Sequence, residues 1–274
     1  MSEDFLKTMA ERSRARVAEA MRTCPTARMF EQAERAPAPV PLVPSAGGFD
    51  IIAELKLRSP ASGALQSKDE DIAARVTSYA AGGAVAVSVV TEPSEFHGEL
   101  AHLEQAARAL RATTTPALRK DFVVDAYQVA QARAAGASGV LIILRMLTPS
   151  QLQAAVAAAE RLGLFTLLEA FDEADIQLAH ELVAGRKESP NPTVLVGVNC
   201  RDLQTLQVVP ARLESLAPLL PRGVPRVAES GVTTAEQARR VRAAGYDMAL
   251  VGSALMRAPD PPELLRQMLH AGRS

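Results

Sequence analysis

Several features are scarce in this 274-residue chain, and each scarcity excludes a class of protein. Cysteine occurs only as Cys24 and Cys200, which excludes a disulfide framework and fits a reducing cytoplasm. The formal net charge is −1, whereas a nucleic-acid-binding surface would need an excess of basic residues. No apolar run approaches the roughly 20 residues of a membrane-spanning helix. Charges interrupt residues 1–21, so we also expect no signal peptide.

Metal ligands are scarce too. The four histidines are scattered along the chain and predict no metal site: His97, His102, His180 and His270. No serine–histidine–aspartate motif is present either. Cys200 directly follows Asn199, so its side chain points the opposite way and predicts packing rather than a nucleophile.

The chain does contain apolar strand-like runs that alternate regularly with alanine-rich helical runs. Apolar residues make up 48% of the chain and charged residues 22%, which is enough for one large core. Nearly continuous apolar runs predict strands buried on both faces, over 50–55, 85–90, 115–118, 139–144, 165–168, 194–198, 224–228 and 248–251. Alanine-rich runs with helical spacing follow them, over 69–81, 100–111, 126–135, 149–162, 172–183, 211–219, 234–244 and 262–269.

Eight strand–helix units predict a (β/α)8 TIM barrel, which typically fills about 250 residues. An open doubly wound sheet is the alternative, but it would need a GxGxxG turn after its first strand, and none is present. Residues 1–48 predict an extra N-terminal segment packed on the barrel: an amphipathic helix, a short helix over 26–35 and a proline-rich link over 36–48. A disordered tail is the alternative for this segment. Residues 49–274 form the predicted catalytic barrel, within one structural domain overall.

In such a barrel the active site lies at the carboxyl ends of the strands. The first strand ends in Glu54 and Lys56, two apart and therefore on the same side, where charges must be paired or used. A purely structural ion pair remains an alternative for them. Lys120 ends the third strand. Desolvation there would lower its pKa and suit it to general acid catalysis or a Schiff base, although a surface lysine is also possible.

Further polar residues end the later strands. Glu169 ends the fifth strand, where burial would favour the protonated form of a general acid. Asn199 and Arg201 end the sixth strand and share a side. Two glycine–serine pairs follow the seventh and eighth strands and feed helix N-termini, the usual phosphate cradle of this architecture: Ser230 with Gly231, and Gly252 with Ser253. Thr233 and Glu236 are expected to form a capping box.

Seven motifs in this order resemble indole-3-glycerol phosphate synthase: IIAELK followed by SP and G, SVVTEP, PALRKDFVVDAYQ, LLEAFDE, GVNCRDL, AESG and LVGSALMR. The resemblance covers about residues 50–257, and the N-terminal helix resembles the leading segment of that family. It implies closure of an indole ring in tryptophan biosynthesis, with loss of carbon dioxide and water. It also implies that no metal or organic cofactor is needed.

The resemblance also implies roles for individual residues. Lys120 would protonate the substrate carbonyl, Glu169 would serve the later dehydration, and Lys56 would contact the substrate. Glu54 and Asn199 would position the sugar hydroxyls and the lysines, and Ser230 falls at a matching position of the family's site. The remaining site residues would bind the substrate. Phe122 and Leu141 would line an anthranilate pocket, and Arg201 would also contact the substrate. The phosphate cradle would consist of Ser59, Gly231, Gly252 and Ser253.

The chain departs from the family pattern at a few positions, none of which removes a proposed acid or base: Ala61, Ala126, Phe171 and Cys200. Three other functions stay open. They are a sugar-phosphate isomerase such as phosphoribosylanthranilate isomerase, a Schiff-base aldolase, and a metabolite-binding barrel without catalysis. The expected partner is a sugar phosphate with an anthranilate moiety, with no nucleic acid or membrane, in a cytoplasmic monomer or weak homodimer. The polar 185–192 segment is expected to be a loop on the opposite face.

Overall fold

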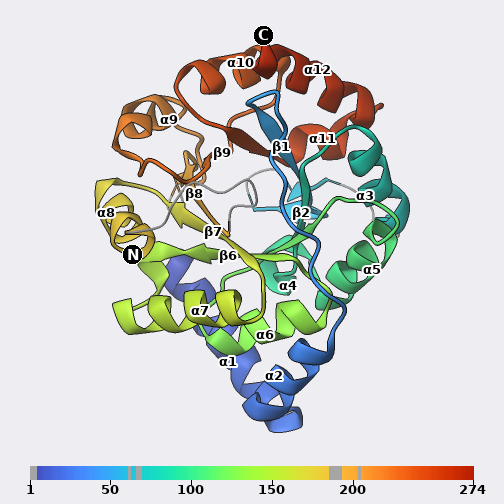
Figure 1. Cartoon of the computed structure of the whole chain (residues 1–274), viewed down its shortest axis with the longest axis vertical. Helices are drawn as coiled ribbons and strands as arrows, with labels where there is room; N and C mark the ends of the chain where they lie inside the picture. The colour runs from blue at the N-terminus through green and yellow to red at the C-terminus, as the bar shows by residue number, and fades with distance from the viewer. Residues whose placement is uncertain (1–4, 61–62, 66–69, 185–192, 203–204) are drawn as a thin grey trace.

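The computed structural model describes residues 5–60, 63–65, 70–184, 193–202 and 205–274. The predicted loop at 185–192 lies outside the described residues. A closed barrel of eight parallel strands forms its centre, with helices around it (Figure 1). The strands follow the circular order β1-β10-β9-β8-β7-β6-β5-β4, which confirms the predicted TIM barrel. A two-stranded antiparallel pair, β2 (Arg58–Ser59) and β3 (Gly63–Ala64), stands outside it.

The eight barrel strands are short and almost wholly buried: β1 (Asp50–Leu55), β4 (Ala86–Val90), β5 (Ala117–Lys120), β6 (Gly139–Ile143), β7 (Phe165–Ala170), β8 (Val194–Asn199), β9 (Arg226–Glu229) and β10 (Met248–Val251). All eight predicted strands are present. Two of the strands, β5 and β9, begin two residues later than predicted. Their polar last residues, Lys120 and Glu229, are therefore part of the barrel wall.

Helices follow the strands around the outside: α3 (Ile72–Ala81), α4 (Pro93–Phe96), α5 (Leu100–Leu110), α6 (Ala126–Ala134), α7 (Pro149–Arg161), α8 (Glu173–Val183), α9 (Ala211–Leu216), α10 (Ala235–Ala243), α11 (Ser253–Arg257) and α12 (Pro261–Arg273). Two 3-10 turns complete the list, η1 (Leu144–Met146) and η2 (Ala217–Leu219). Among the described helices, none is long and apolar enough to cross a membrane. Every predicted helix has a counterpart, and α4 was not predicted.

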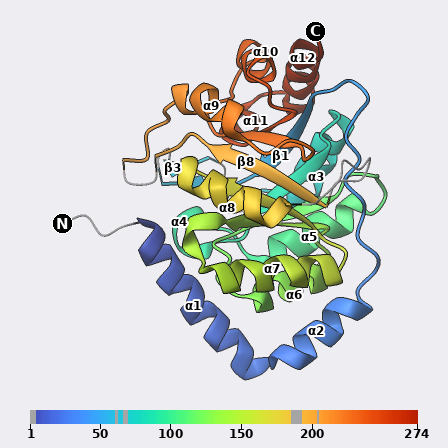
Figure 2. The same cartoon turned by 60° about the vertical axis from the view of Figure 1, so that its left-hand side comes forward.

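The N-terminal segment forms α1 (Phe5–Thr23) and α2 (Thr26–Arg35), which make a V along the flank of the barrel (Figure 2). The buried face of α1 carries Met9, Ala10, Ser13 and Val17. The link that follows is tied to the barrel by Arg133, whose Nη2 donates to the backbone oxygen of Ala36 at 2.8 Å. The division of the chain at residue 48 stays a prediction.

Two apolar layers hold the barrel together. Inward side chains fill its interior, among them Ile52, Leu118 and Leu167. Their chain neighbours point outward into the larger core between strands and helices, as Ile51 and Ala53 do. This alternation follows from the two-residue period of a strand. It decides which polar residues at the strand ends face the barrel axis.

Candidate active site

A cleft opens at the carboxyl ends of the barrel strands, with an empty volume of about 1160 Å³ that includes its open mouth. Almost all the site residues predicted from the sequence line it: Glu54, Lys56, Ser59, Lys120, Phe122, Glu169, Asn199, Arg201, Ser230, Gly231, Gly252 and Ser253. Leu141 does not appear among the lining residues; Ile143, two residues further along β6, lines the cleft instead. Both side chains face the barrel interior, but Leu141 lies one step deeper.

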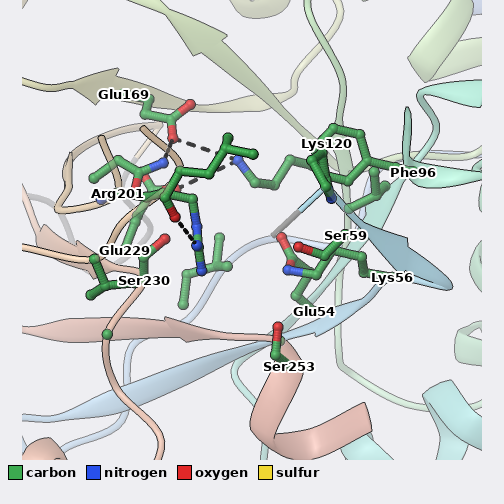
Figure 3. Close-up of a pocket in the computed structure, with 18 of the residues that line it drawn as sticks. Glu54, Lys56, Ser59, Phe96, Lys120, Glu169, Arg201, Glu229, Ser230 and Ser253 are labelled. Atoms are coloured by element: carbon green, nitrogen blue, oxygen red, sulfur yellow. Dashed lines mark hydrogen bonds and ion pairs between the residues drawn. The ribbon is translucent and has the colours of Figure 1, made fainter. Parts of the chain in front are cut away.

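Four charged side chains at the floor of the cleft come from alternate strands. Glu54, Lys120, Glu169 and Glu229 lie on β1, β5, β7 and β9. Alternate strands of such a barrel supply the four side chains of one interior layer. Here that layer holds three carboxylates and one ammonium in place of the usual aliphatic side chains. Figure 3 shows Lys120 reaching across toward Glu169 and Glu229.

Lys120 is surrounded by carboxylates. Its Nζ lies 3.6 Å from Glu169 Oε1 and 3.8 Å from Glu229 Oε2. Burial by itself would lower the pKa of Lys120, but the negative charges of Glu169, Glu229 and Glu54 raise it above its ordinary value. The sequence-based expectation of a lowered pKa is therefore wrong, because three strands distant in sequence bring carboxylates around this lysine. Lys120 is a charged ammonium at neutral pH and not a free amine.

Glu229 is the functional residue that the sequence reasoning missed. It is 1% exposed, and neither of its carboxylate oxygens has a hydrogen-bond partner among the described residues. Burial, and then the nearby charge of Glu169, raise its pKa well above the ordinary value, although Lys120 opposes this. Gly197 makes room for it, since a Cβ at that position would lie 2.2 Å from Glu229 Oε1. The signal was present: Glu229 follows the inward-facing Val227 by two residues.

Glu54 and Lys56 form the close pair expected from their spacing. Lys56 Nζ lies 2.6 Å from Glu54 Oε1. Burial would raise the pKa of Glu54, but Lys56 and then Lys120 hold it below its ordinary value, so this carboxylate is charged. Gly252 packs directly against it, because a Cβ on Gly252 would lie 2.2 Å from Glu54 Oε1. Gly252 is therefore required to leave space for the Glu54 carboxylate, in addition to any role in letting an anion approach the backbone.

Asn199 and Arg201 extend this polar floor on the side of β8. The Nδ2 of Asn199 donates to Glu169 Oε1 at 2.5 Å, and its Oδ1 accepts from the backbone nitrogen of Arg201 at 2.9 Å. The Arg201 guanidinium donates to the backbone oxygen of Leu206 at 2.7 Å. The amide therefore orients Glu169, and the guanidinium adds a cation at the rim.

The opposite wall of the cleft is aromatic. Phe122 follows β5, and its ring lies 6.2 Å from that of Phe96 in α4 and 5.9 Å from that of Phe5 in α1, between ring centroids. All three rings line the cleft. Phe171, one of the departures, also lines it and stacks under the Arg145 guanidinium at 4.9 Å. Such a wall offers apolar ring surfaces against which a flat aromatic group can pack.

The serine and glycine positions occupy the remaining rim. Ser230 and Gly231 both have positive φ, 66° and 74°, a backbone conformation that is uncommon for a serine. The predicted capping box of Thr233 and Glu236 is wrong. Thr234 caps α10, accepting from the backbone nitrogen of Gln237 at 3.3 Å, because the helix begins one residue later than that box requires.

Two further expectations from the sequence bear on metals and thiols. Within the described residues, no cluster of three histidine, cysteine or acidic side chains could hold a metal ion. His97, in the loop between β4 and α5, ends α4 in the left-handed conformation. Cys200 is fully buried in the outer core, and burial raises its thiol pKa to about 11, as expected of a packing residue.

Comparisons with known proteins agree with this geometry. The family model described as indole-3-glycerol phosphate synthase matches residues 6–268. A protein of that name from Micrococcus luteus is 42% identical over 252 residues, covering 89% of this chain and 89% of the relative. Another from Parafrankia is 39% identical over 269 residues, covering 97% and 96%.

Solved structures share the fold alone. The 3-hexulose-6-phosphate synthase of Salmonella typhimurium has a TM-score of 0.60 at 14% identity, covering 81% of this chain and 98% of its own. Orotidine 5'-phosphate decarboxylase of Pyrococcus horikoshii has a TM-score of 0.59 at 15% identity, covering 82% and 99%. The family model and the curated relatives both span most of the sequence, and on that basis this chain belongs to the indole-3-glycerol phosphate synthase family.

Proposed function

We propose that this chain is an indole-3-glycerol phosphate synthase acting in tryptophan biosynthesis. It converts 1-(2-carboxyphenylamino)-1-deoxyribulose 5-phosphate to indole-3-glycerol phosphate, with loss of carbon dioxide and water, and so acts as a carboxy-lyase. The observation that carries this is the half-buried Lys120 ammonium, held among buried carboxylates, in the same cleft as an aromatic wall. Family membership selects the reaction, and the arrangement of charges supports it.

Ring closure needs a proton donor at the substrate carbonyl oxygen. As the aromatic carbon attacks the carbonyl carbon, that oxygen becomes an alkoxide, which is more basic than an amine. An ammonium with a raised pKa therefore still donates to it, and Lys120 is the donor that we assign. Loss of the carboxylate as carbon dioxide then restores the aromatic ring. Burial of the reacting groups strengthens these charge interactions.

Dehydration follows, and Glu169 is assigned to it. The hydroxyl must leave as water while a proton is lost from the neighbouring carbon or nitrogen. Glu169 is 1% exposed and is oriented by the amide of Asn199, which suits a group that passes a proton at a defined place. Glu54 holds Lys56 toward the substrate, and Glu54 itself is assigned to the sugar hydroxyls. Ser230 completes the group of positioning side chains.

The two anionic ends of the substrate need cations and backbone amides. We assign the anthranilate carboxylate to the side of Arg201 and Lys56, and its ring to the wall around Phe122. The phosphate is assigned to the rim that carries Ser59, Gly231, Gly252 and Ser253, because glycines leave backbone amides open to an anion. The substrate is the only partner that the proposal requires, in a cytoplasmic protein that is a monomer or a weak homodimer and takes no metal or organic cofactor.

Two enzymatic alternatives predict different outcomes. A Schiff-base aldolase needs a neutral lysine amine, which the raised pKa of Lys120 disfavours. An isomerase would turn over phosphoribosylanthranilate instead. The test incubates the purified protein with the carboxyphenylamino-deoxyribulose phosphate and follows indole fluorescence, with borohydride and with phosphoribosylanthranilate in parallel. Indole formation without borohydride trapping supports the proposal, and its absence in a folded protein refutes it.

A further inference from the structure

Arg16 of α1 bridges two buried carboxylates that belong to neighbouring loops of the barrel mouth. Its Nη2 donates to Asp121 Oδ1 at 2.8 Å, and its Nη1 lies 3.5 Å from Glu92 Oε1. Both acidic side chains are 1% exposed, whereas the Arg16 side chain is 31% exposed. A bond between a guanidinium and buried carboxylates is among the stronger hydrogen bonds of a protein, so this bridge restrains both loops.

Glu92 controls the orientation of Phe96. Its carboxylate caps the four-residue helix α4 by accepting from the backbone nitrogens of Ser94 at 2.9 Å, Glu95 at 2.7 Å and Phe96 at 3.2 Å. So short a helix has few backbone hydrogen bonds of its own, and besides this cap its backbone accepts from Arg58 Nη1, at the oxygen of Glu95, at 2.9 Å. The place of the Phe96 ring in the cleft therefore depends on where the Glu92 carboxylate is held.

Asp121 controls Phe122 in the same manner. Its Oδ1 accepts from the backbone nitrogen of Phe122 at 2.8 Å, and its Oδ2 accepts from Thr91 Oγ1 at 2.8 Å and Arg119 Nη2 at 2.9 Å. Burial would raise the pKa of Asp121, but Arg119 and Arg16 hold it below its ordinary value, so the charge that Arg16 binds is present at neutral pH. Asp121 also directly follows Lys120 in the chain.

We propose that Arg16 is a positioning residue for the cleft. By tying Glu92 to Asp121, it sets the relation between the Phe96 and Phe122 rings and hence the fit of the aromatic part of the substrate. The inference rests on the proposed function, since that function supplies an aromatic ring to be bound. It makes α1 a working part of the site through this bridge as well as through Phe5, which lines the cleft.

The test compares three full-length variants. Arg16→Met removes the bridge. Arg16→Lys keeps the charge, but a single ammonium cannot span both carboxylates in the way that a guanidinium does. Arg161→Met is the matched control: Arg161 joins the same N-terminal segment to the barrel through Glu34 of α2, away from the cleft, and stacks 5.2 Å from the Phe30 ring. KM, kcat and the melting temperature are measured for each.

Arg16→Met should raise KM about tenfold, the order expected when one charge-assisted contact ceases to hold the binding geometry. Arg16→Lys should raise KM less, and Arg161→Met should lower the melting temperature while leaving KM unchanged. An unchanged KM in Arg16→Met, or an equal rise in the control, would overturn the inference. If Arg16→Met does not fold, an unchanged KM in Arg16→Lys overturns it as well. A wild-type protein without turnover would instead refute the proposed function.

Discussion

Adding a single methyl group at Gly252 should disable the site through Glu54. The Cβ of an alanine there would lie 2.2 Å from Glu54 Oε1 and 3.0 Å from its Cδ, whereas ordinary contact begins near 3.4 Å. The Glu54 carboxylate must therefore move by about 1 Å, and a displacement of that size in a catalytic array costs on the order of 100-fold in rate. Lys56, which lies 2.6 Å from Oε1, would lose its partner at the same time.

Steady-state kinetics of Gly252→Ala measure this effect, and we expect kcat to fall about 100-fold. If Gly252 served only to let a phosphate approach the backbone, KM would rise while kcat stayed near the wild-type value. The double variant with Glu54→Ala separates the two explanations. Once the carboxylate is gone, the alanine at 252 should cost nothing further in kcat. Additive losses in the double variant, or a wild-type kcat in Gly252→Ala, would refute the reasoning.

Three further predictions concern single groups. Lys120→Met should lower kcat by about 100-fold or more, with a smaller effect on KM, as expected for lost acid catalysis; near-native turnover would sink the assignment. The raised pKa of Glu229 means that the folded protein keeps a proton which the unfolded chain releases near pH 4, so stability should fall as pH rises through the folded pKa. Urea unfolding should show a smaller fall between pH 5 and pH 8 in Glu229→Gln, and an identical fall would contradict this. A thiol reagent at pH 8 should modify Cys24 but leave Cys200 intact until the protein unfolds, because burial raises the Cys200 pKa to about 11.

The fold was predictable from the sequence because each barrel strand is buried on both faces and most of the helices have an apolar face that recurs at helical spacing. Boundaries were less predictable where polar residues extend a strand. The run 115–118 predicts a strand that stops before Arg119 and Lys120, yet β5 continues to Lys120, which pairs with Val90 of β4 and whose inward side chain meets carboxylates. The four residues of α4 gave no helical period, and their helix depends on the cap supplied by Glu92.

The residues of the site were largely predictable, but their interactions were not. The two-residue spacing of Glu54 and Lys56 is a local signal, and the pair forms as expected. The charge state of Lys120 depends on carboxylates from β1, β7 and β9, which only closure of the barrel brings together. Glu229 is harder to predict because the serine and glycine after it indicate a phosphate cradle instead. Its two-residue spacing from the inward-facing Val227 nevertheless predicts that its side chain points into the barrel.

The most direct test of the central claim is the stoichiometry of a single reaction, measured on purified protein dialysed against EDTA. The chain contains no tryptophan, so indole fluorescence from the product appears without a tryptophan background from the protein. Carbon dioxide released from carboxyl-labelled substrate is counted in the same sample. One carbon dioxide for each indole formed, at a rate that EDTA does not change, is the predicted result. Substrate consumed without carbon dioxide, or indole formation that requires an added metal, would contradict the assignment.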